Sequence, residues 1–242
     1  MKTFGKYSFL YVITVLIVVL FGGVQAIAKS PQRQAKPVVS ILGDSYSTFQ
    51  GYIPEENLSW YSTSPDRSRT DVDDVTQTWW WQLVSEGGYI LGKNDSYSGA
   101  TVCYTGYRGE DYADRSFITR LPRVGSADIL LIFGATNDSW ARVPMGEFVY
   151  KNLTRGHYYE FRPALGRLLE GAKKMYPGTD VYFILNDGLS EAVADAVMKE
   201  CKHFDIPVIV LSDIDKKAGH PTRRGMIQIK EQVLNALQAK SM

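Results

Sequence analysis

Four separate segments of this sequence carry residues that together would suit acyl transfer. They contain Ser45, Gly99, Asn137 and His220. Acyl transfer needs a nucleophile, a base that accepts its proton, and hydrogen-bond donors that stabilise the oxyanion. Ser45 is a candidate nucleophile and His220 a candidate base. The backbone N–H groups of Ser45 and Gly99 and the side-chain amide of Asn137 are candidate oxyanion donors, provided that the fold brings these residues together.

Hydrophobic patterns predict the elements that must position these residues. Apolar, β-branched runs predict strands that are covered on both faces. Four clear runs lie at 37–42, 128–133, 180–185 and 207–211, and a weaker fifth run lies at 89–91. Stripes with helical spacing lie at 161–175, 190–204 and 226–237. Strands that alternate with helices predict a parallel sheet of about five strands between two layers of helices.

This arrangement would gather the four residues at one edge of the sheet. Ser45 follows the first apolar run, Gly99 the weak one, and Asn137 the run at 128–133, while His220 lies between the last strand and the last helix. Ligand sites in open parallel sheets lie beyond the carboxyl ends of the strands. We therefore expect Ser45, Gly99, Asn137 and His220 to border a single site.

The same segments resemble the sequence blocks of a known superfamily. The strings "GDSYS" at 43–47, "SYSGAT" at 96–101, "GATND" at 134–138 and "GHP" at 219–221 occur in the order typical of SGNH hydrolases, also called GDSL esterases/lipases. The resemblance runs from Gly43 to the last helix. It implies a flavodoxin-like, three-layer α/β/α sandwich, with Ser45 as nucleophile, His220 as base, and Ser45, Gly99 and Asn137 as oxyanion donors.

The sequence departs from the family pattern near the histidine. The family usually places an aspartate three residues before it, where this chain has Lys217. Asp215 lies five residues before His220, and Gly219 would let the chain curl, so we expect the Asp215 carboxylate to orient the imidazole. The alternative is that a backbone carbonyl orients the ring, which would leave a Ser–His dyad.

The third block departs as well. Its usual form has one residue between the glycine and the asparagine, whereas "GATND" has two. Either Ala135 replaces the family glycine or this loop is one residue longer than usual.

The N-terminal segment reads as a targeting sequence. Residues 1–28 contain two early lysines, an apolar run and an Ala-Ile-Ala ending, which is typical of a cleaved secretory signal peptide. An uncleaved membrane anchor is the alternative, because the run approaches the length of about 20 apolar residues that spans a bilayer. Residues 29–36 form a polar leader, and residues 37–242 the esterase-type domain. We therefore expect an exported protein, periplasmic or secreted, with no membrane contact in its mature form.

Composition narrows the classes of partner and covalent chemistry. The formal net charge of the chain is +1, which gives no indication of a nucleic-acid partner. An exported chain could pair Cys103 with Cys201. However, Cys201 shares one apolar helix face with Val193 and Val197, which favours a buried free thiol.

The string "TWWWQLV" at 78–84 places three consecutive tryptophans on a predicted helix. Three such positions span about 200° of the helix circumference, so the three rings cannot all face one core. We expect at least one of them to lie under the long polar segment at 51–75 or to line the cleft.

These observations predict a serine esterase that hydrolyses carboxylic esters without a metal or an organic cofactor. Export and the tryptophan-rich surroundings favour an ester of a carbohydrate, such as an O-acetylated glycan, and a short-chain lipid ester is equally compatible. A catalytically impaired carbohydrate-binding module is the main alternative, supported by Lys217 at the usual aspartate position. A flavodoxin-like phosphate binder is disfavoured, because the first loop has one glycine rather than a glycine-rich cradle.

Overall fold

The structure, a computed structural model, describes residues 35–240. The predicted signal peptide at 1–28 and most of the polar leader lie outside these residues. Within the described part of the chain, no helix combines the length and hydropathy that crossing a bilayer requires.

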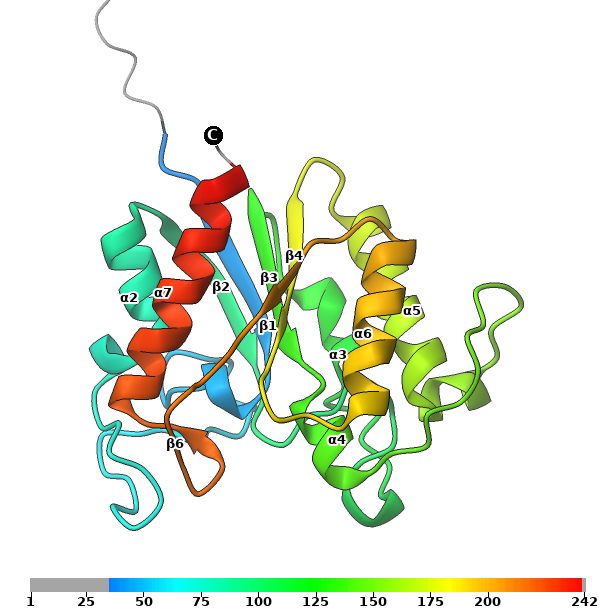
Figure 1. Ribbon diagram of the computed structural model, residues 1–242, viewed down its shortest axis with the longest axis horizontal. Coiled ribbons are helices and arrows are strands. Elements are labelled where there is room, and N and C mark those ends of the chain that lie inside the picture. Colours follow the sequence, from blue (N-terminus) through cyan, green and yellow to red (C-terminus); the bar gives the residue numbers. More distant parts are fainter. Residues whose placement is uncertain (1–34, 241–242) are drawn as a thin grey trace, which may run out of the picture. The chain divides into compact units, whose positions relative to one another are not determined.

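A five-stranded, fully parallel sheet forms the centre of the fold (Figure 1). Its strands stand in the order β2-β1-β3-β4-β5, which is the flavodoxin-like order. They are β1 Val38–Gly43, β2 Ile90–Ser96, β3 Ile129–Gly134, β4 Asp180–Leu185 and β5 Val208–Val210. All five predicted strands are confirmed, and the weak one is longer than expected because β2 continues to Ser96.

Helices cover both faces of the sheet, as the predicted three-layer sandwich requires. One layer contains α2 Trp79–Gly87 and α7 Arg223–Lys240, and the other contains α3 Phe117–Arg120, α5 Phe161–Met175 and α6 Glu191–His203 (Figure 1). Alternate side chains of each strand enter opposite cores. In β1, Ile41 packs toward α2 and α7, and Leu42 packs toward α5 and α6.

Shorter elements lie between the main helices and strands. They are the 3₁₀ turns η1 Ser45–Ser47, η2 Val75–Gln77, η3 Tyr107–Gly109, η4 Leu121–Arg123 and η5 Arg155–Tyr159, the helix α4 Thr136–Ala141, and the two-residue strands β6 Lys216–Lys217 and β7 His220–Pro221. Strands β6 and β7 pair antiparallel as a small hairpin. This hairpin, η1 and α4 carry three of the four predicted site residues.

The tryptophan run and the cysteines behave as the sequence predicts. Trp79 and Trp80 are fully buried, whereas Trp81 is half-buried and packs edge-on against Tyr52 of the long polar segment, with ring centroids 5.7 Å apart. Cys103 and Cys201 are both buried free thiols.

Candidate active site

Ser45 begins the η1 turn immediately after β1, with its hydroxyl beyond the carboxyl edge of the sheet. The Asp44 carboxylate caps this turn by accepting a hydrogen bond from the Tyr46 N–H at 3.0 Å. Gly43 is required by packing. A Cβ at that position would lie 2.8 Å from the Ser47 Cβ, closer than two carbon atoms can approach. The absent side chain thus allows the turn to fold back against the end of the strand.

His220 reaches Ser45 from the other end of the chain. Its Nε2 lies 3.0 Å from the Ser45 Oγ, and both side chains are almost fully buried. Two tyrosine hydroxyls hold the hairpin that carries the histidine. The Tyr46 hydroxyl donates to the Gly219 carbonyl at 2.6 Å, and the Tyr61 hydroxyl donates to the Pro221 carbonyl at 3.0 Å. The serine–histidine pair that the sequence predicts therefore comes together in the fold.

The expectation that Asp215 orients the imidazole is wrong. The Nδ1 of His220 lies 3.1 Å from the backbone carbonyl oxygen of Ala218, so Nδ1–H donates to this carbonyl and Nε2 is left to accept a proton. The Asp215 carboxylate instead accepts a hydrogen bond from the Thr222 hydroxyl. The alternative of a backbone carbonyl is the observed arrangement.

Hairpin register explains this correction. Lys217 pairs with His220 and Lys216 with Pro221, so Asp215 falls one step further along the hairpin, beside Thr222 rather than the ring. The chain reverses through positive φ angles of 48° at Ala218 and 77° at Gly219, and the Ala218 carbonyl then lies within hydrogen-bond distance of the imidazole Nδ1. Gly219 does let the chain curl, but the curl presents a carbonyl and not a carboxylate.

Two backbone donors that follow the neighbouring strands β1 and β2 are unpaired. Among the described residues, the N–H groups of Ser45 and Gly99 have no hydrogen-bond acceptor. Gly99 adopts a φ of 84°, and a Cβ there would meet nothing within 4 Å, so open space lies in front of its backbone.

Asn137 lies in the first turn of α4 with its amide fixed at both ends. Its Nδ2 donates to the Ala100 carbonyl at 2.9 Å, and its Oδ1 accepts a hydrogen bond from the Tyr107 hydroxyl at 2.8 Å. The Ala100 carbonyl only accepts, so the amide orientation is determined, and one N–H of Nδ2 has no partner in these contacts. Ala135, before the helix, adopts a φ of 72°, a conformation that favours glycine. This geometry favours the replacement of the family glycine by Ala135.

Two buried carboxylates stabilise the loops of the site. Asp138 accepts hydrogen bonds from the Val102 and Cys103 N–H groups and so anchors the loop that follows Gly99. Burial raises the pKa of Asp138 to about 6 and that of Asp44 to about 7. Each carboxyl group therefore has a structural role in the backbone around the site.

A buried arginine connects the ends of two strands beneath the serine. Arg120 is fully buried, donates to the Gly43 carbonyl at 3.1 Å, and lies 3.4 Å from the Asp95 carboxylate. Burial lowers the pKa of this guanidinium to about 10, and the neighbouring Asp95 opposes the shift. No local sequence pattern indicates Arg120 or Tyr107, because both act on residues far away in the chain.

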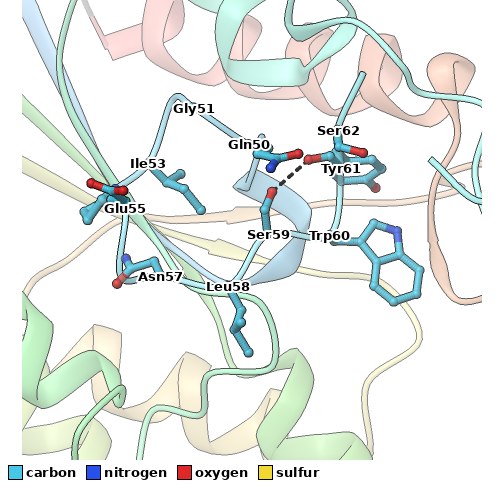
Figure 2. Close-up of a pocket in the computed structure, with 11 residues that line it drawn as sticks. Gln50, Gly51, Ile53, Glu55, Asn57, Leu58, Ser59, Trp60, Tyr61 and Ser62 are labelled. Carbon is cyan, nitrogen blue, oxygen red and sulfur yellow. Dashed lines mark hydrogen bonds between the residues drawn. The ribbon is translucent and has the colours of Figure 1, made fainter. Parts of the chain in front are cut away.

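A cavity of about 680 Å³ lies within the segment from Gln50 to Ser62 (Figure 2). Ser59 stabilises its wall by donating to the Tyr61 carbonyl at 2.8 Å. Trp60 lines this cavity and also stacks on the His220 ring, whereas Ser45 and His220 are not among the residues that line it. Among the described residues, no cluster of His, Cys, Asp and Glu side chains is arranged to hold a metal ion.

Comparisons with known proteins agree with this geometry. Two solved structures, from Bacteroides ovatus and Bacteroides uniformis and each described as a candidate GDSL-like lipase, share 49% and 46% identity with this chain. Both cover 85% of this chain, over 100% and 97% of their own lengths, with TM-scores of 0.83 and 0.82.

A more distant likeness is to an acetyl xylan esterase from Butyrivibrio proteoclasticus, at 10% identity and a TM-score of 0.57. It covers 86% of this chain and 64% of that protein, and it shows a shared fold alone. No curated protein matches the chain. The family model for the GDSL-like lipase/acylhydrolase family matches residues 37–237, so this chain belongs to that family of ester-cleaving hydrolases.

Proposed function

We propose that this protein is an exported serine esterase in which Ser45 and His220 act as a nucleophile–base dyad. The observation that carries the proposal is the 3.0 Å separation of the Ser45 Oγ and the His220 Nε2. The unpaired N–H groups of Ser45 and Gly99 follow the neighbouring strands β1 and β2 and so belong to the same edge of the sheet. A nucleophile within hydrogen-bond reach of a base whose other nitrogen is oriented is the arrangement that acyl transfer requires.

The reaction would proceed in two balanced halves. The Ser45 Oγ attacks the ester carbonyl carbon while its proton moves to the His220 Nε2, and the carbonyl oxygen becomes an oxyanion. The Ser45 and Gly99 N–H groups and the Asn137 amide would stabilise that oxyanion. Collapse then breaks the bond to the alcohol oxygen, which takes the proton from Nε2. Water then attacks the acyl-enzyme in the same way while His220 again accepts and returns the proton. This step releases the acid and regenerates the Ser45 hydroxyl.

An acylated carbohydrate is the substrate class that we favour. Trp140 is 40% exposed and contacts the His220 ring, on whose side the leaving alcohol must be protonated. Flat aromatic faces beside a leaving group suit the apolar face of a sugar ring. An acetyl xylan esterase uses the same fold, so the fold is compatible with a substrate of this class.

Hydrolysis of p-nitrophenyl acetate by the purified mature protein tests the proposed chemistry. We expect turnover that Ser45→Ala and His220→Ala each reduce by about 10³-fold or more, since removal of a nucleophile or base leaves only residual catalysis. Wild-type turnover no higher than that of Ser45→Ala would contradict the proposal and identify a binding module instead.

A second assay addresses the substrate. O-acetylated xylo-oligosaccharides and a short-chain triglyceride are compared by acid release at equal ester concentration. A higher kcat/KM for the oligosaccharide supports the carbohydrate assignment, and the reverse result assigns a lipid esterase.

Export is tested by measuring the mass of the protein that is recovered outside the cytoplasm. We expect this mass to match a chain that begins directly after Ala28.

A further inference from the structure

The His220 imidazole lacks the carboxylate that usually supports a catalytic histidine. A carboxylate on Nδ1 stabilises the imidazolium that forms when the histidine takes the serine proton. Here Nδ1 faces the neutral Ala218 carbonyl at 3.1 Å, and a neutral acceptor gives a weaker bond to a charged ring than a carboxylate does. The nearby cations Arg69 and Lys216 further disfavour a positive ring.

One face of the imidazole is covered by an indole. The rings of Trp60 and His220 are parallel to within 8°, with centroids 3.5 Å apart. Tyr46 and Trp140 contact the same imidazole at 5.5 and 5.6 Å, but at interplanar angles of 53° and 68°. Trp60 is therefore the ring whose π face lies directly against the histidine.

Trp60 is itself held on both sides. Its backbone N–H donates to the Thr48 hydroxyl at 2.9 Å, and the Arg69 guanidinium carbon lies 4.1 Å from the centroid of its ring. Two groups cannot both lie about 4 Å above one ring on the same face, so Arg69 and His220 occupy opposite faces. The indole is thus clamped between a guanidinium and the imidazole, three residues in a single stack.

We propose that Trp60 is a positioning residue that performs the missing carboxylate's two tasks. Its flat contact fixes the plane of the His220 ring, so that Nε2 stays aimed at the Ser45 hydroxyl. Its electron-rich face then stabilises the imidazolium during proton transfer, since an aromatic face attracts a cation that lies close above it. This inference rests on the proposed esterase function.

The test compares Trp60→Leu, Trp60→Phe and the wild type with p-nitrophenyl acetate, a substrate too small to depend on remote binding. We expect Trp60→Leu to lower kcat about 5- to 30-fold, the range of a desolvated cation–π contact, with KM within about twofold of wild type. Trp60→Phe restores a flat π face and is expected to recover at least half of that loss on a logarithmic scale. Trp81→Leu, a half-buried tryptophan replaced on α2, is the matched control and should retain full kcat.

Proton NMR of the imidazole provides a readout that does not need turnover. The chain has three histidines, so His220→Gln identifies the His220 ring signals by their loss. A stacked indole shifts these signals upfield, and we expect the shift to disappear in Trp60→Leu and to persist in part in Trp60→Phe.

The outcomes separate the two proposals. An inactive wild type refutes the esterase proposal. The role of Trp60 is refuted if the wild type is active and Trp60→Leu either keeps its kcat or changes only in KM. It is also refuted if Trp60→Phe does not recover the kcat that Trp60→Leu loses. If Trp60→Leu does not fold, an upfield shift in the wild type with near-wild-type kcat in Trp60→Phe supports the role, and the absence of that shift refutes it.

Discussion

The Tyr107 hydroxyl donates a hydrogen bond to the Asn137 Oδ1 at 2.8 Å, which connects the Asn137 side chain on α4 to the η3 turn 30 residues earlier in the chain. Asn137 already donates to the Ala100 carbonyl, so its amide is held by one donor and one acceptor. A hydrogen bond to the carbonyl oxygen of an amide also polarises its N–H groups, which strengthens them as donors. Tyr107 thus supports the proposed oxyanion donor, the Asn137 amide, in position and in strength.

We expect Tyr107→Phe to reduce kcat for p-nitrophenyl acetate by about 2- to 12-fold with little change in KM, because a bond of about 1 kcal/mol supports a group that acts mainly in the transition state. Steady-state kinetics at pH 7.5 measure this effect. Tyr112→Phe is the matched control, since it removes a tyrosine hydroxyl from the same segment. Equal kcat for Tyr107→Phe and wild type would show that Ala100 alone is sufficient to position Asn137.

Asp215 provides the opposite expectation. Because its carboxylate bonds the Thr222 hydroxyl and the imidazole uses the Ala218 carbonyl, Asp215→Asn should keep kcat within about twofold of wild type. In a serine–histidine–aspartate triad, the same substitution costs about 10⁴-fold through the wrong tautomer. Steady-state kinetics over pH 6–8 distinguish these values easily. A loss of 10³-fold or more would mean that Asp215 moves to the ring when substrate binds.

The pH dependence of activity follows from the environment of His220. Burial lowers the pKa of its imidazole to about 4, with the Ala218 carbonyl opposing this shift and Arg69 and Lys216 adding to it. The base must be neutral to accept the serine proton, so kcat/KM should fall only as the pH drops toward 4. We expect activity at pH 5.5 to be within about twofold of that at pH 7.5, whereas an ordinary histidine pKa near 6.5 would leave about one-tenth.

The measurement is kcat/KM from pH 4 to pH 8, with circular dichroism at each pH to confirm that the protein remains folded. An inflection near pH 6.5 would show that the imidazole is not desolvated in solution. The carboxyl groups of Asp44 and Asp138 also titrate in this interval, so the pH profile of Asp138→Asn is measured alongside to separate the contribution of Asp138.

The fold could be predicted well because its signal is local. Strands β1, β3 and β4 are buried on both faces and read as continuous apolar runs, and the α7 stripe of Met226, Ile229 and Val233 is buried as expected. The sequence signal for strand β2 is weak for a physical reason. Its last three residues, Asn94 to Ser96, are polar and yet buried, and distant partners such as Arg120 satisfy them.

The positions of the candidate site residues could be predicted from the sequence, whereas the side chains and backbone groups that support them could not. Ser45, Gly99, Asn137 and His220 each follow a strand or precede a helix, so their positions follow from the topology. The partner of the His220 Nδ1 depends on hairpin register, and a shift of one residue pair decides between Ala218 and Asp215. Tyr107, Trp60 and Arg120 act across 30 to 160 residues of chain, a distance over which no local pattern carries information.

Gly43 leads to a prediction about stability. A Cβ there would lie 2.8 Å from the Ser47 Cβ and also press on the Ser96 hydroxyl, in a region where the Arg120 guanidinium bonds the Gly43 carbonyl. Ser47 and Ser96 are both fully buried, so Gly43→Ala should lower the free energy of unfolding by about 1–3 kcal/mol. The displaced η1 turn should also lengthen the Ser45–His220 hydrogen bond and reduce kcat. Urea unfolding and steady-state kinetics test both effects. Gly156→Ala is the control, since its Cβ would meet only the Thr154 hydroxyl at 3.6 Å, and a loss of similar size in that variant would remove the packing explanation.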